Sequence, residues 1–549
     1  MKRKITNFVN YKYFPYLIIL IVSSLLIITF KDNYIKGDDT FFHVSNIEVI
    51  RLNLFNLSKI RPIIGNNFGY GIGIFYPQLP HIFSGVIAFI TSDTILSMKI
   101  TKYIVTLLSG IVMYIYASKV FKDKHLSLVA SISYITSSYF IVDMFYRDAF
   151  NESFVFVFMP IVFLGFYYLF DEDDHKKFIL FFTLGYIGLL YSHLVLSVWF
   201  TIYVLIYLLF NIKEVFKNLK YFIIASLFIL LITSPYTVLL SEHMLNKSYY
   251  ITSFIYEADR IWRISPFDYI LRINWTTTKA YLFVSLSYIS TIGVIIGIIR
   301  LFKEKNKSLK KLLIIFLILS GLAITFTSSY YSLAILPNFL LNIQFAWRNA
   351  TFVVFFLILF SVEGFSFFYK GLKTNQKILP SSVIILFLLV HMFDSLNLVK
   401  TYDNIDSCIS SCGMGWETEY LPNKTIDNEY IDSRSEGIII LNGKANINII
   451  LNETPDLVFD VNDLNDEAII ELPRIYYLGY ELVDSNDNII DYDMDDNGFI
   501  SAKITNNGTY KLSYEGTKLY KVFRIISFVT IIVFIIYVFK RKITSLTIK

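Results

Sequence analysis

The sequence predicts a polytopic α-helical membrane protein that carries an extracellular β-sandwich-like domain. Of its 549 residues, 55% are hydrophobic and only 17% are charged, whereas soluble domains average about 45–50% apolar and about 25% charged residues. Apolar runs of about 18 residues or more recur along the chain, and a run of that length crosses a bilayer as a helix. One stretch differs, because residues 401–521 hold 23 acidic and 8 basic residues, a net charge of −15.

Basic residues beside the apolar runs predict how the spans are oriented. Lys2, Arg3 and Lys4 precede the first span and place the N-terminus in the cytoplasm. The lysine-rich turn "KVFKDKH" at 119–125 is expected to be cytoplasmic. Because the chain is outside the cell at residue 31, only one span can lie between residue 31 and this turn. The short run at 80–91 is therefore predicted to be an interfacial helix, as is the amphipathic stretch at 41–55. About twelve spans follow, with both termini cytoplasmic: 13–30, 100–118, 126–142, 152–170, 178–193, 195–211, 221–240, 281–302, 311–328, 349–370, 378–396 and 522–539.

The acidic stretch reads as a domain of its own outside the cell. Short β-branched or alternating runs, among them "NINIILNE", "DLVFDVND" and "GFISAKIT", are separated by Asn, Asp and Gly turns, which is typical of a small β sandwich. We therefore expect three parts: a transmembrane domain at 1–399 with an external loop at 31–98, an extracellular β domain at 400–521, and a C-terminal helix and cytoplasmic tail at 522–549.

Unusual polar residues gather on the predicted external side. The stretch "YIKGDDTFFH" follows the first span, "VDMFYRDAFNES" the third, and "QFAWRNA" opens the tenth. A single charged residue at the end of a span is most often a solvated cap, but several on one side indicate a site. An external carboxylate suits a general base, and an arginine fork suits a phosphate. Because nucleotide sugars are normally absent outside the cell, the donor for sugar transfer there would be lipid-bound.

Several stretches carry a family resemblance through their order and spacing. "GDDTFFHVSNIEVIRLNLFN" and "FGYGIGIFYPQLPHIFSGVIAFI" resemble the start of the YfhO-like bacterial membrane proteins and of the related group labelled 6-pyruvoyl-tetrahydropterin synthase-related. The resemblance continues through "YRDAFNESFVFVFMP", "IQFAWRNATFVV", "WETEYLP" and "LPRIYYLGYELV" and so covers most of the chain. These families are similar to GT-C glycosyltransferases, whose first external loop carries an acidic residue and two juxtamembrane helices.

The resemblance implies a glycosyltransferase of the cell membrane that acts on the outer face. The donor would be a polyprenyl-phosphate-linked sugar and the acceptor teichoic or lipoteichoic acid, or another surface glycopolymer or lipid. Asp39 stands where the resemblance places the family's catalytic base, and Asp38 is the substitute for that role. The residues that would line the substrate site are His43, Arg147, Asp148, Glu152, His193 and Arg348, with Arg348 on the lipid phosphate. The resemblance leaves open a divalent metal, Mg or Mn.

Partners and rival functions follow from the same observations. We expect contacts with membrane lipids and no nucleic-acid partner, because loop lysines explain the basic pI near 8.7. The alternatives are an envelope lipid or polysaccharide transporter or flippase, or a non-catalytic envelope-binding scaffold. A transporter places ionisable or helix-breaking residues near mid-membrane in paired halves of the sequence. The polar residues here gather at one face instead, which disfavours a transporter. The net charge of −15 on the β domain disfavours binding of a polyanion, such as a teichoic acid, by that domain alone.

Two short motifs in the β domain could form a disulfide and a calcium loop. Cys408 and Cys412 in "CISSC" are spaced for a disulfide, and a pair of free thiols is equally compatible with the sequence. "DMDDNGF" at 493–499 starts like a calcium loop, but Ile504 stands where the glutamate ligand belongs. We predict a hairpin turn at Asn497-Gly498.

Overall fold

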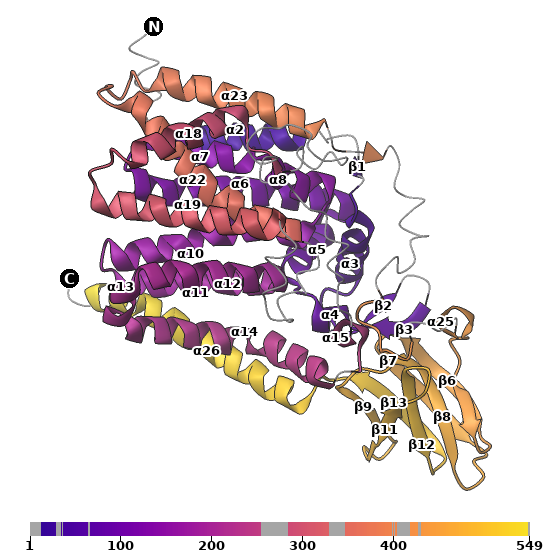
Figure 1. The fold of residues 1–549 in the computed structure, drawn as a ribbon. Helices are drawn as coiled ribbons and strands as arrows, with labels where there is room; N and C mark the ends of the chain where they lie inside the picture. Colours follow the sequence, from indigo (N-terminus) through magenta and orange to yellow (C-terminus); the bar gives the residue numbers. More distant parts are fainter. Residues whose placement is uncertain are drawn as a thin grey trace. The chain divides into compact units, whose positions relative to one another are not determined.

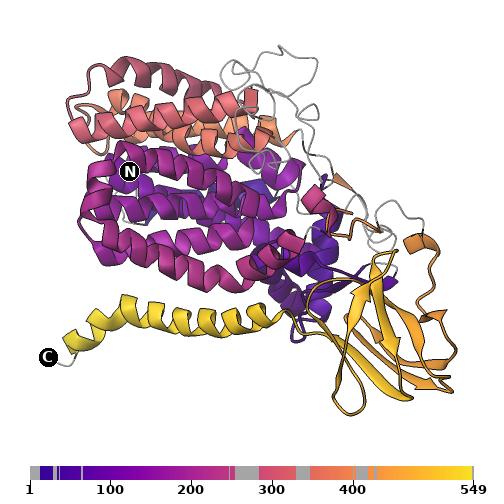
Figure 2. The ribbon, with the colours of Figure 1, turned by 60° about the horizontal axis from the view of Figure 1, so that its bottom comes forward.

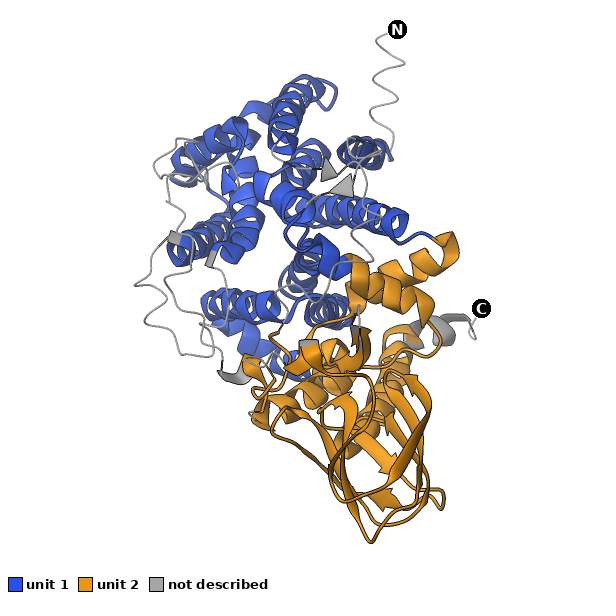
Figure 3. Cartoon of the chain, turned by 90° about the vertical axis from the view of Figure 1, so that its right-hand side faces the viewer, with its two compact units in different colours: residues 1–43, 93–227, 255–405 blue, residues 44–92, 228–254, 406–549 orange. Residues whose placement is uncertain are grey.

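The chain divides into two compact units, each built from segments distant in sequence (Figure 3). Unit 1 comprises residues 1–43, 93–227 and 255–405, and unit 2 comprises 44–92, 228–254 and 406–549. The computed structural model describes residues 13–28, 34–35, 37–63, 66–246, 248–253, 284–328, 346–397, 399, 401–402, 418–425 and 430–546. Cys408 and Cys412 lie outside the described residues.

Unit 1 is a helix bundle (Figure 1). Helix α10 packs against α6 and α11, and α22 packs against α7, α18 and α19. The helices that build it are α2 (Phe14–Ile28), α6 (Thr94–Phe121), α7 (Lys124–Ile135), α8 (Ser138–Ile141), α10 (Val155–Phe170), α11 (His175–Ser192), α12 (Leu194–Phe210), α18 (Tyr288–Leu301), α19 (Lys307–Ser328), α22 (Ala350–Tyr369) and α23 (Ile378–Leu396).

The helices confirm a polytopic membrane protein. Among the described residues, seven helices are long and apolar enough to cross a membrane, and a bent helix pair at 124–146 counts as an eighth. Each of the twelve predicted spans overlaps helical residues, those of α14 (Leu219–Asn246) and α26 (Lys518–Leu546) included. The span predicted at 126–142 falls on the bent pair, and α2, α12 and α18 have only 15, 17 and 14 residues, so the count of twelve spans stays a prediction. Helix α5 (Leu79–Thr91) has 13 residues, about 20 Å of helix, which is shorter than a bilayer core. The orientation of the spans and the interfacial position of α5 and of α3 (Thr40–Leu52) stay predictions.

Close helix contact in unit 1 depends on glycine. A Cβ added at Gly364 of α22 would stand 1.9 Å from the carbonyl oxygen of Gly293 in α18. Small residues at such positions let two helix backbones approach, which replaces the hydrophobic driving force that lipid does not supply. Helix α22 is buried along most of its length and forms the centre of this part of the bundle.

Strands β5 to β13 of unit 2 form a sandwich of two antiparallel sheets, and β2 (Arg61–Ile63) and β3 (Asn66–Tyr70) form a separate two-stranded sheet. The five-stranded sheet has the order β10 (Ile489–Ile490), β9 (Tyr480–Val483), β13 (Gly508–Tyr514), β7 (Asp456–Asn462) and β6 (Asn446–Glu453). The four-stranded sheet has the order β11 (Tyr492–Met494), β12 (Phe499–Ile504), β8 (Ala468–Ile475) and β5 (Ile439–Asn442). Alternate side chains such as Leu457, Phe459 and Val461 are buried between them.

The predicted β runs are strands, and the predicted hairpin is confirmed. β11 pairs antiparallel with β12, and in the turn between them the Asp495 carboxylate accepts hydrogen bonds from the backbone N–H of Asn497 and of Phe499. The short strands β10 and β11 are too brief to show an alternating pattern in the sequence.

An aromatic cluster joins the sandwich to the other segments of unit 2. Phe75, at the end of α4 (Ile72–Phe75), stacks on Tyr420 with ring centroids 5.1 Å apart. Tyr477 stacks on Tyr249 at 5.6 Å, and its hydroxyl donates to the Tyr420 carbonyl. Helix α26 follows the sandwich as one continuous helix (Figure 2), and Ser527 on it donates to the Ile232 carbonyl in α14.

Candidate functional site

A distorted turn after α8 creates the centre of the candidate site. Residues Val142–Tyr146 form a π-helical turn, η1, which Arg147 closes by donating its backbone N–H to the Val142 carbonyl at 2.8 Å. Asp148 then adopts a φ of 58°, a left-handed conformation that Asp tolerates better than most residues. π-helical turns are frequent at functional sites. The turn ends in the short helix α9 (Phe150–Ser153), which contains Glu152.

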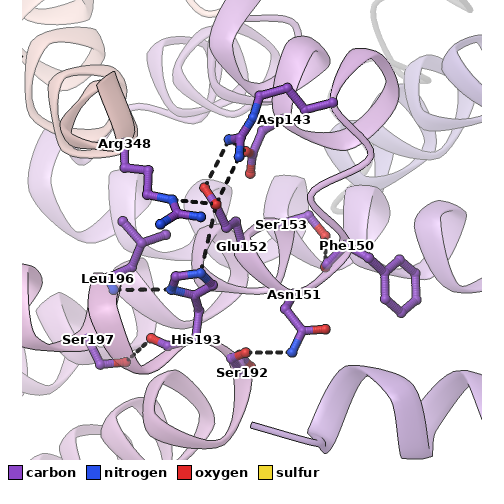
Figure 4. Close-up of polar contacts among 11 residues, drawn as sticks. Asp143, Phe150, Asn151, Glu152, Ser153, Ser192, His193, Leu196, Ser197 and Arg348 are labelled. Carbon is purple, nitrogen blue, oxygen red and sulfur yellow. Dashed lines mark hydrogen bonds and ion pairs between the residues drawn. The ribbon is translucent and has the colours of Figure 1, made fainter. Parts of the chain in front are cut away.

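Glu152 holds two arginines that come from distant segments (Figure 4). Arg147 donates through Nη1 to Oε2 and through Nη2 to Oε1, both at 3.2 Å. Arg348, in the 3-10 turn η3 (Ala346–Asn349), donates through Nε to Oε1 at 2.7 Å. The Glu152 side chain is 2% exposed. Asp143 also accepts from Arg147, at 3.1 Å, so two carboxyl groups face the two guanidinium groups.

His193 lies against the same carboxylate (Figure 4). It separates α11 from α12, and its Nδ1 accepts the backbone N–H of Leu196, which caps α12. An accepting Nδ1 leaves the proton of a neutral imidazole on Nε2. Nε2 lies 3.8 Å from Glu152 Oε1, beyond hydrogen-bond distance, so the contact is electrostatic.

Asp39 is placed beside this cluster by the backbone. Its N–H donates to the Arg147 carbonyl at 3.0 Å. Gly37 makes this contact feasible, because a Cβ there would stand 2.4 Å from the Asp148 Cβ. The Asp39 side chain is half-buried, whereas Asp38 is exposed.

Burial raises the pKa of the Asp39 carboxyl to about 6. The charges of Arg147 and Arg348 oppose this shift, and those of Glu152 and Asp38 reinforce it. Asp39 therefore titrates close to neutral pH, where a general base works best.

A second buried network ties the Asp39 segment down. Asp148 pairs with Lys102 of α6, Nζ to Oδ1 at 2.6 Å, and both side chains are at most 2% exposed. The Thr40 hydroxyl donates to the other oxygen of Asp148 at 2.7 Å and accepts the backbone N–H of Gly37 at 2.9 Å. Because both oxygens of Asp148 are engaged, its contacts are those of a residue that positions the 37–40 segment.

Sequence reasoning missed Lys102 and Thr40. Lys102 carried a usable signal, since a lysine at the predicted external end of a span departs from the positive-inside rule. Thr40 carried none, because its partner Asp148 is 108 positions away in the sequence.

His43 is buried among aromatic rings. Its ring centroid lies 5.0 Å from that of Phe42 and 5.6 Å from that of Phe150. Burial lowers its pKa to about 4, so the imidazole is neutral at physiological pH. A neutral imidazole suits packing and hydrogen bonding to a sugar, and it supplies no positive charge for a phosphate.

The residues do not form a metal site in the part of the chain that the structure describes. No group of three His, Cys, Asp or Glu side chains there is arranged to hold a metal ion. Glu152 and Asp143 are already engaged by Arg147. We therefore derive no step through Mg or Mn.

The structure brings four of the predicted site residues into one cluster, and the other predicted site residues lie beside that cluster. Arg147, His193 and Arg348 converge on the carboxylate of Glu152. Asp39 lies next to them, whereas Asp148 and His43 belong to the adjoining buried layer. Their roles toward a substrate stay predictions.

Comparisons with known proteins give distant similarities. No protein-family model matches the chain. An uncharacterized protein of Lactococcus lactis subsp. cremoris (strain MG1363) is 27% identical over 226 residues, which cover 38% of this chain and 36% of that protein. The arabinofuranosyltransferase AftD from Mycobacteria has a TM-score of 0.49 and 14% identity over 72% of this chain and 28% of its own. The Archaeoglobus fulgidus oligosaccharyltransferase has a TM-score of 0.43 and 14% identity over 71% of this chain and 55% of its own. No residue role is carried over from these proteins.

Proposed function

We propose that the protein is a membrane glycosyltransferase that moves a sugar from a polyprenyl-phosphate donor to a hydroxyl of a cell-envelope acceptor on the outer face. The observation that carries the proposal is Asp39, a half-buried carboxyl with a pKa near 6, held by its backbone against a buried cluster of two arginines and a glutamate.

Asp39 is the general base in this proposal. It takes the proton of the acceptor hydroxyl while the acceptor oxygen bonds to the anomeric carbon of the sugar. The bond from that carbon to the phosphate oxygen breaks, and its electron pair leaves with the polyprenyl phosphate. A carboxyl with a pKa near 6 is mostly ionised at pH 7 and more basic than an ordinary aspartate. Asp38, exposed at the next position, is the substitute base.

Arg348 and Arg147 supply positive charge for the lipid phosphate. Glu152 holds both guanidinium groups, so their orientation is set before a substrate arrives. Guanidinium groups remain charged and hold phosphate oxygens through paired N–H donors. His193 lies against Glu152 and adjoins the proposed substrate site, whereas Asp148 and His43 support that site from the adjoining buried layer.

The acceptor class rests on the family resemblance. Teichoic or lipoteichoic acid is one candidate, and another surface glycopolymer or lipid is the other. The acidic β domain, with its net charge of −15 over 401–521, would repel a polyanionic chain at low salt. An acceptor that carries fewer phosphates would experience less of this repulsion.

The test is transfer of radiolabelled sugar in membranes that contain the full chain, with a panel of polyprenyl-phosphate sugars as donors. We expect transfer by the wild type and by Asp173→Asn, a control at an exposed carboxylate, and at least a hundredfold less by Asp39→Asn at equal expression, because general bases contribute about 10²–10⁴-fold. No transfer by the wild type with any donor would overturn the proposed activity. Full transfer by Asp39→Asn would move the base to Asp38.

A further inference from the structure

Two carboxyl groups meet in the β sandwich of unit 2. Glu471 of β8 is fully buried, and Asp495 is half-buried in the turn at 495–498 between β11 and β12. The two side chains hydrogen-bond to each other. Such a bond requires a proton on one of the two groups, because an ionised carboxylate can only accept. The pair therefore holds a proton in this arrangement.

The other partners of Glu471 keep that side chain ionised. Arg434 donates through Nε to Oε1 at 2.5 Å, and both side chains of this ion pair are fully buried. The Tyr430 hydroxyl lies 2.9 Å from Oε1 and 3.1 Å from Oε2, and Asn497 Nδ2 donates to Oε2 at 3.4 Å. Burial favours the neutral form of Glu471, but its hydrogen bonds, that of Asp495 first, and the charge of Arg434 outweigh burial and lower its pKa.

The shared proton therefore belongs to Asp495. Its Oδ1 accepts the backbone N–H of Asn497 at 2.9 Å and that of Phe499 at 2.8 Å. Its Oδ2 is buried, and no donor reaches it from the described residues, which suits an O–H group better than a charged oxygen. Burial raises the pKa of Asp495 to about 7, and the hydrogen bond and charge of Glu471 act in the same direction. Asp495 thus exchanges its proton near neutral pH.

The surroundings of the pair offer little to replace that proton. The titratable groups that lie around it are Tyr430, Arg434, Lys424, Asp493 and Asp496. Lys424 donates to the Asp495 backbone carbonyl and to Asp496 Oδ1, both at 3.0 Å, rather than to the Asp495 carboxyl. Loss of the proton leaves two adjoining carboxylates that share the charge of Arg434.

The turn that contains Asp495 also supports the segment 418–425. A Cβ added at Gly498 would stand 2.9 Å from the Thr425 side chain, so the turn and the segment are in close contact. The segment in turn continues to the chain beyond α14, because the backbone N–H of Asn423 donates to the Ser248 carbonyl at 2.8 Å. The position of the turn therefore bears on residues outside the sandwich.

We propose that Glu471 and Asp495 form a pH-sensitive latch, in which the shared proton holds the β11–β12 turn against β8 and loss of the proton releases the turn. Repulsion between two adjoining carboxylates in a partly buried place drives the release. The released turn no longer supports the segment 418–425. This device is independent of the proposed glycosyl transfer and uses none of its residues.

The test is hydrogen exchange of the backbone amides at 495–499, followed by mass spectrometry in the full-length protein in detergent, with each rate divided by the intrinsic rate at the same pH. The closed turn holds a proton that the open turn, with an ordinary aspartate, has lost, so closure is favoured at low pH and weakens as pH rises through about 7. We expect protection of these amides in the wild type to fall about tenfold between about pH 6 and about pH 8.

Two variants of the same hairpin sharpen this measurement. Asp495→Asn keeps an N–H donor toward Glu471 at every pH, so its protection is expected to stay constant. Asp493→Asn is the matched control at an exposed carboxylate of β11 and is expected to follow the wild type. The amides of β7, in the other sheet, are the internal reference and are expected to keep their protection.

Three outcomes would overturn the proposal. Constant protection of the turn in the wild type would show that the pair exchanges no proton in this range, whether or not the variants fold. The same pH response in Asp495→Asn as in the wild type, or its loss in Asp493→Asn, would assign the titration to another group. An equal fall of protection in β7 would show that the whole sandwich responds and not the turn.

Discussion

A buried cluster of unit 1 and a buried arginine of unit 2 differ in how their charges are matched, although unit 2 also holds a buried ion pair between Arg434 and Glu471. In unit 1, Glu152 faces Arg147 and Arg348, and Asp148 faces Lys102. In unit 2, Arg61 is as deeply buried, and among the described residues its side chain has one hydrogen-bond partner, the Asn46 amide oxygen at 3.3 Å. Charges paired within the protein hold a site in a set geometry before a ligand arrives, whereas a buried charge without a counter-charge lowers stability. The comparison thus distinguishes the Glu152 cluster, whose charges are paired in advance, from Arg61, whose charge has no carboxylate partner among the described residues.

The largest expected effect is on the paired cluster. Glu152→Gln keeps the size of the side chain but removes the charge shared by two buried arginines. We expect a loss of about 3–5 kcal/mol in the free energy of unfolding, the usual cost of breaking a buried ion pair, measured by thermal unfolding in detergent. Unchanged stability would show that the two arginines are compensated by other groups.

The Lys102–Asp148 pair offers a sharper version of the same test. Lys102→Met alone leaves the Asp148 carboxylate buried beside the Thr40 hydroxyl only, and we expect about 3 kcal/mol of destabilisation. The double variant Lys102→Met with Asp148→Asn removes both charges, keeps a side chain that tolerates the φ of 58° at position 148, and is expected to recover at least half of that loss. Equal losses in the single and double variants would argue against a coupled pair.

Transfer activity is expected to depend on pH through Asp39. Because the pKa of this carboxyl is raised to about 6, the base is protonated below that pH, and the rate falls as pH drops from about 7 to about 5. The negative charge of Asp38 contributes to the raised pKa, so Asp38→Asn is expected to shift the midpoint to lower pH. The measurement is the pH profile of kcat/KM for sugar transfer. A midpoint that is the same in both proteins would contradict the assignment of Asp39 as the titrating group.

The smallest expected effect is at the unpaired arginine. Arg61→Met replaces a buried charge, which has no carboxylate partner among the described residues, with an apolar chain of similar length. In lipid-free detergent we expect a change of less than about 1 kcal/mol in unfolding free energy, or a gain, since such replacements are often neutral or stabilising. A loss as large as that of Glu152→Gln would remove the contrast between Arg61 and the Glu152 cluster.

The elements of the fold were accessible from the sequence, and the site was accessible only in part. Apolar runs and loop lysines predicted the positions of the helices in the bundle, and alternating runs predicted strands such as β6, β7 and β12. The same patterns placed Asp39, Glu152 and Arg348 near span ends. Which carboxylate would hold which arginine has no signature in the sequence, because Glu152 and Arg348 are 196 positions apart.

The sequence by itself determined the class of protein, since hydrophobic length and periodicity depend on residues close together in the chain. Only the tertiary structure decided that Asp39 is half-buried beside a buried arginine pair and that Asp148 is held by Lys102 and Thr40. It also decided that Arg61 is buried with one weak hydrogen bond among the described residues. Burial and charge balance depend on what distant segments bring to the same place, and those two quantities set the pKa of a base and the demand for a counter-ion.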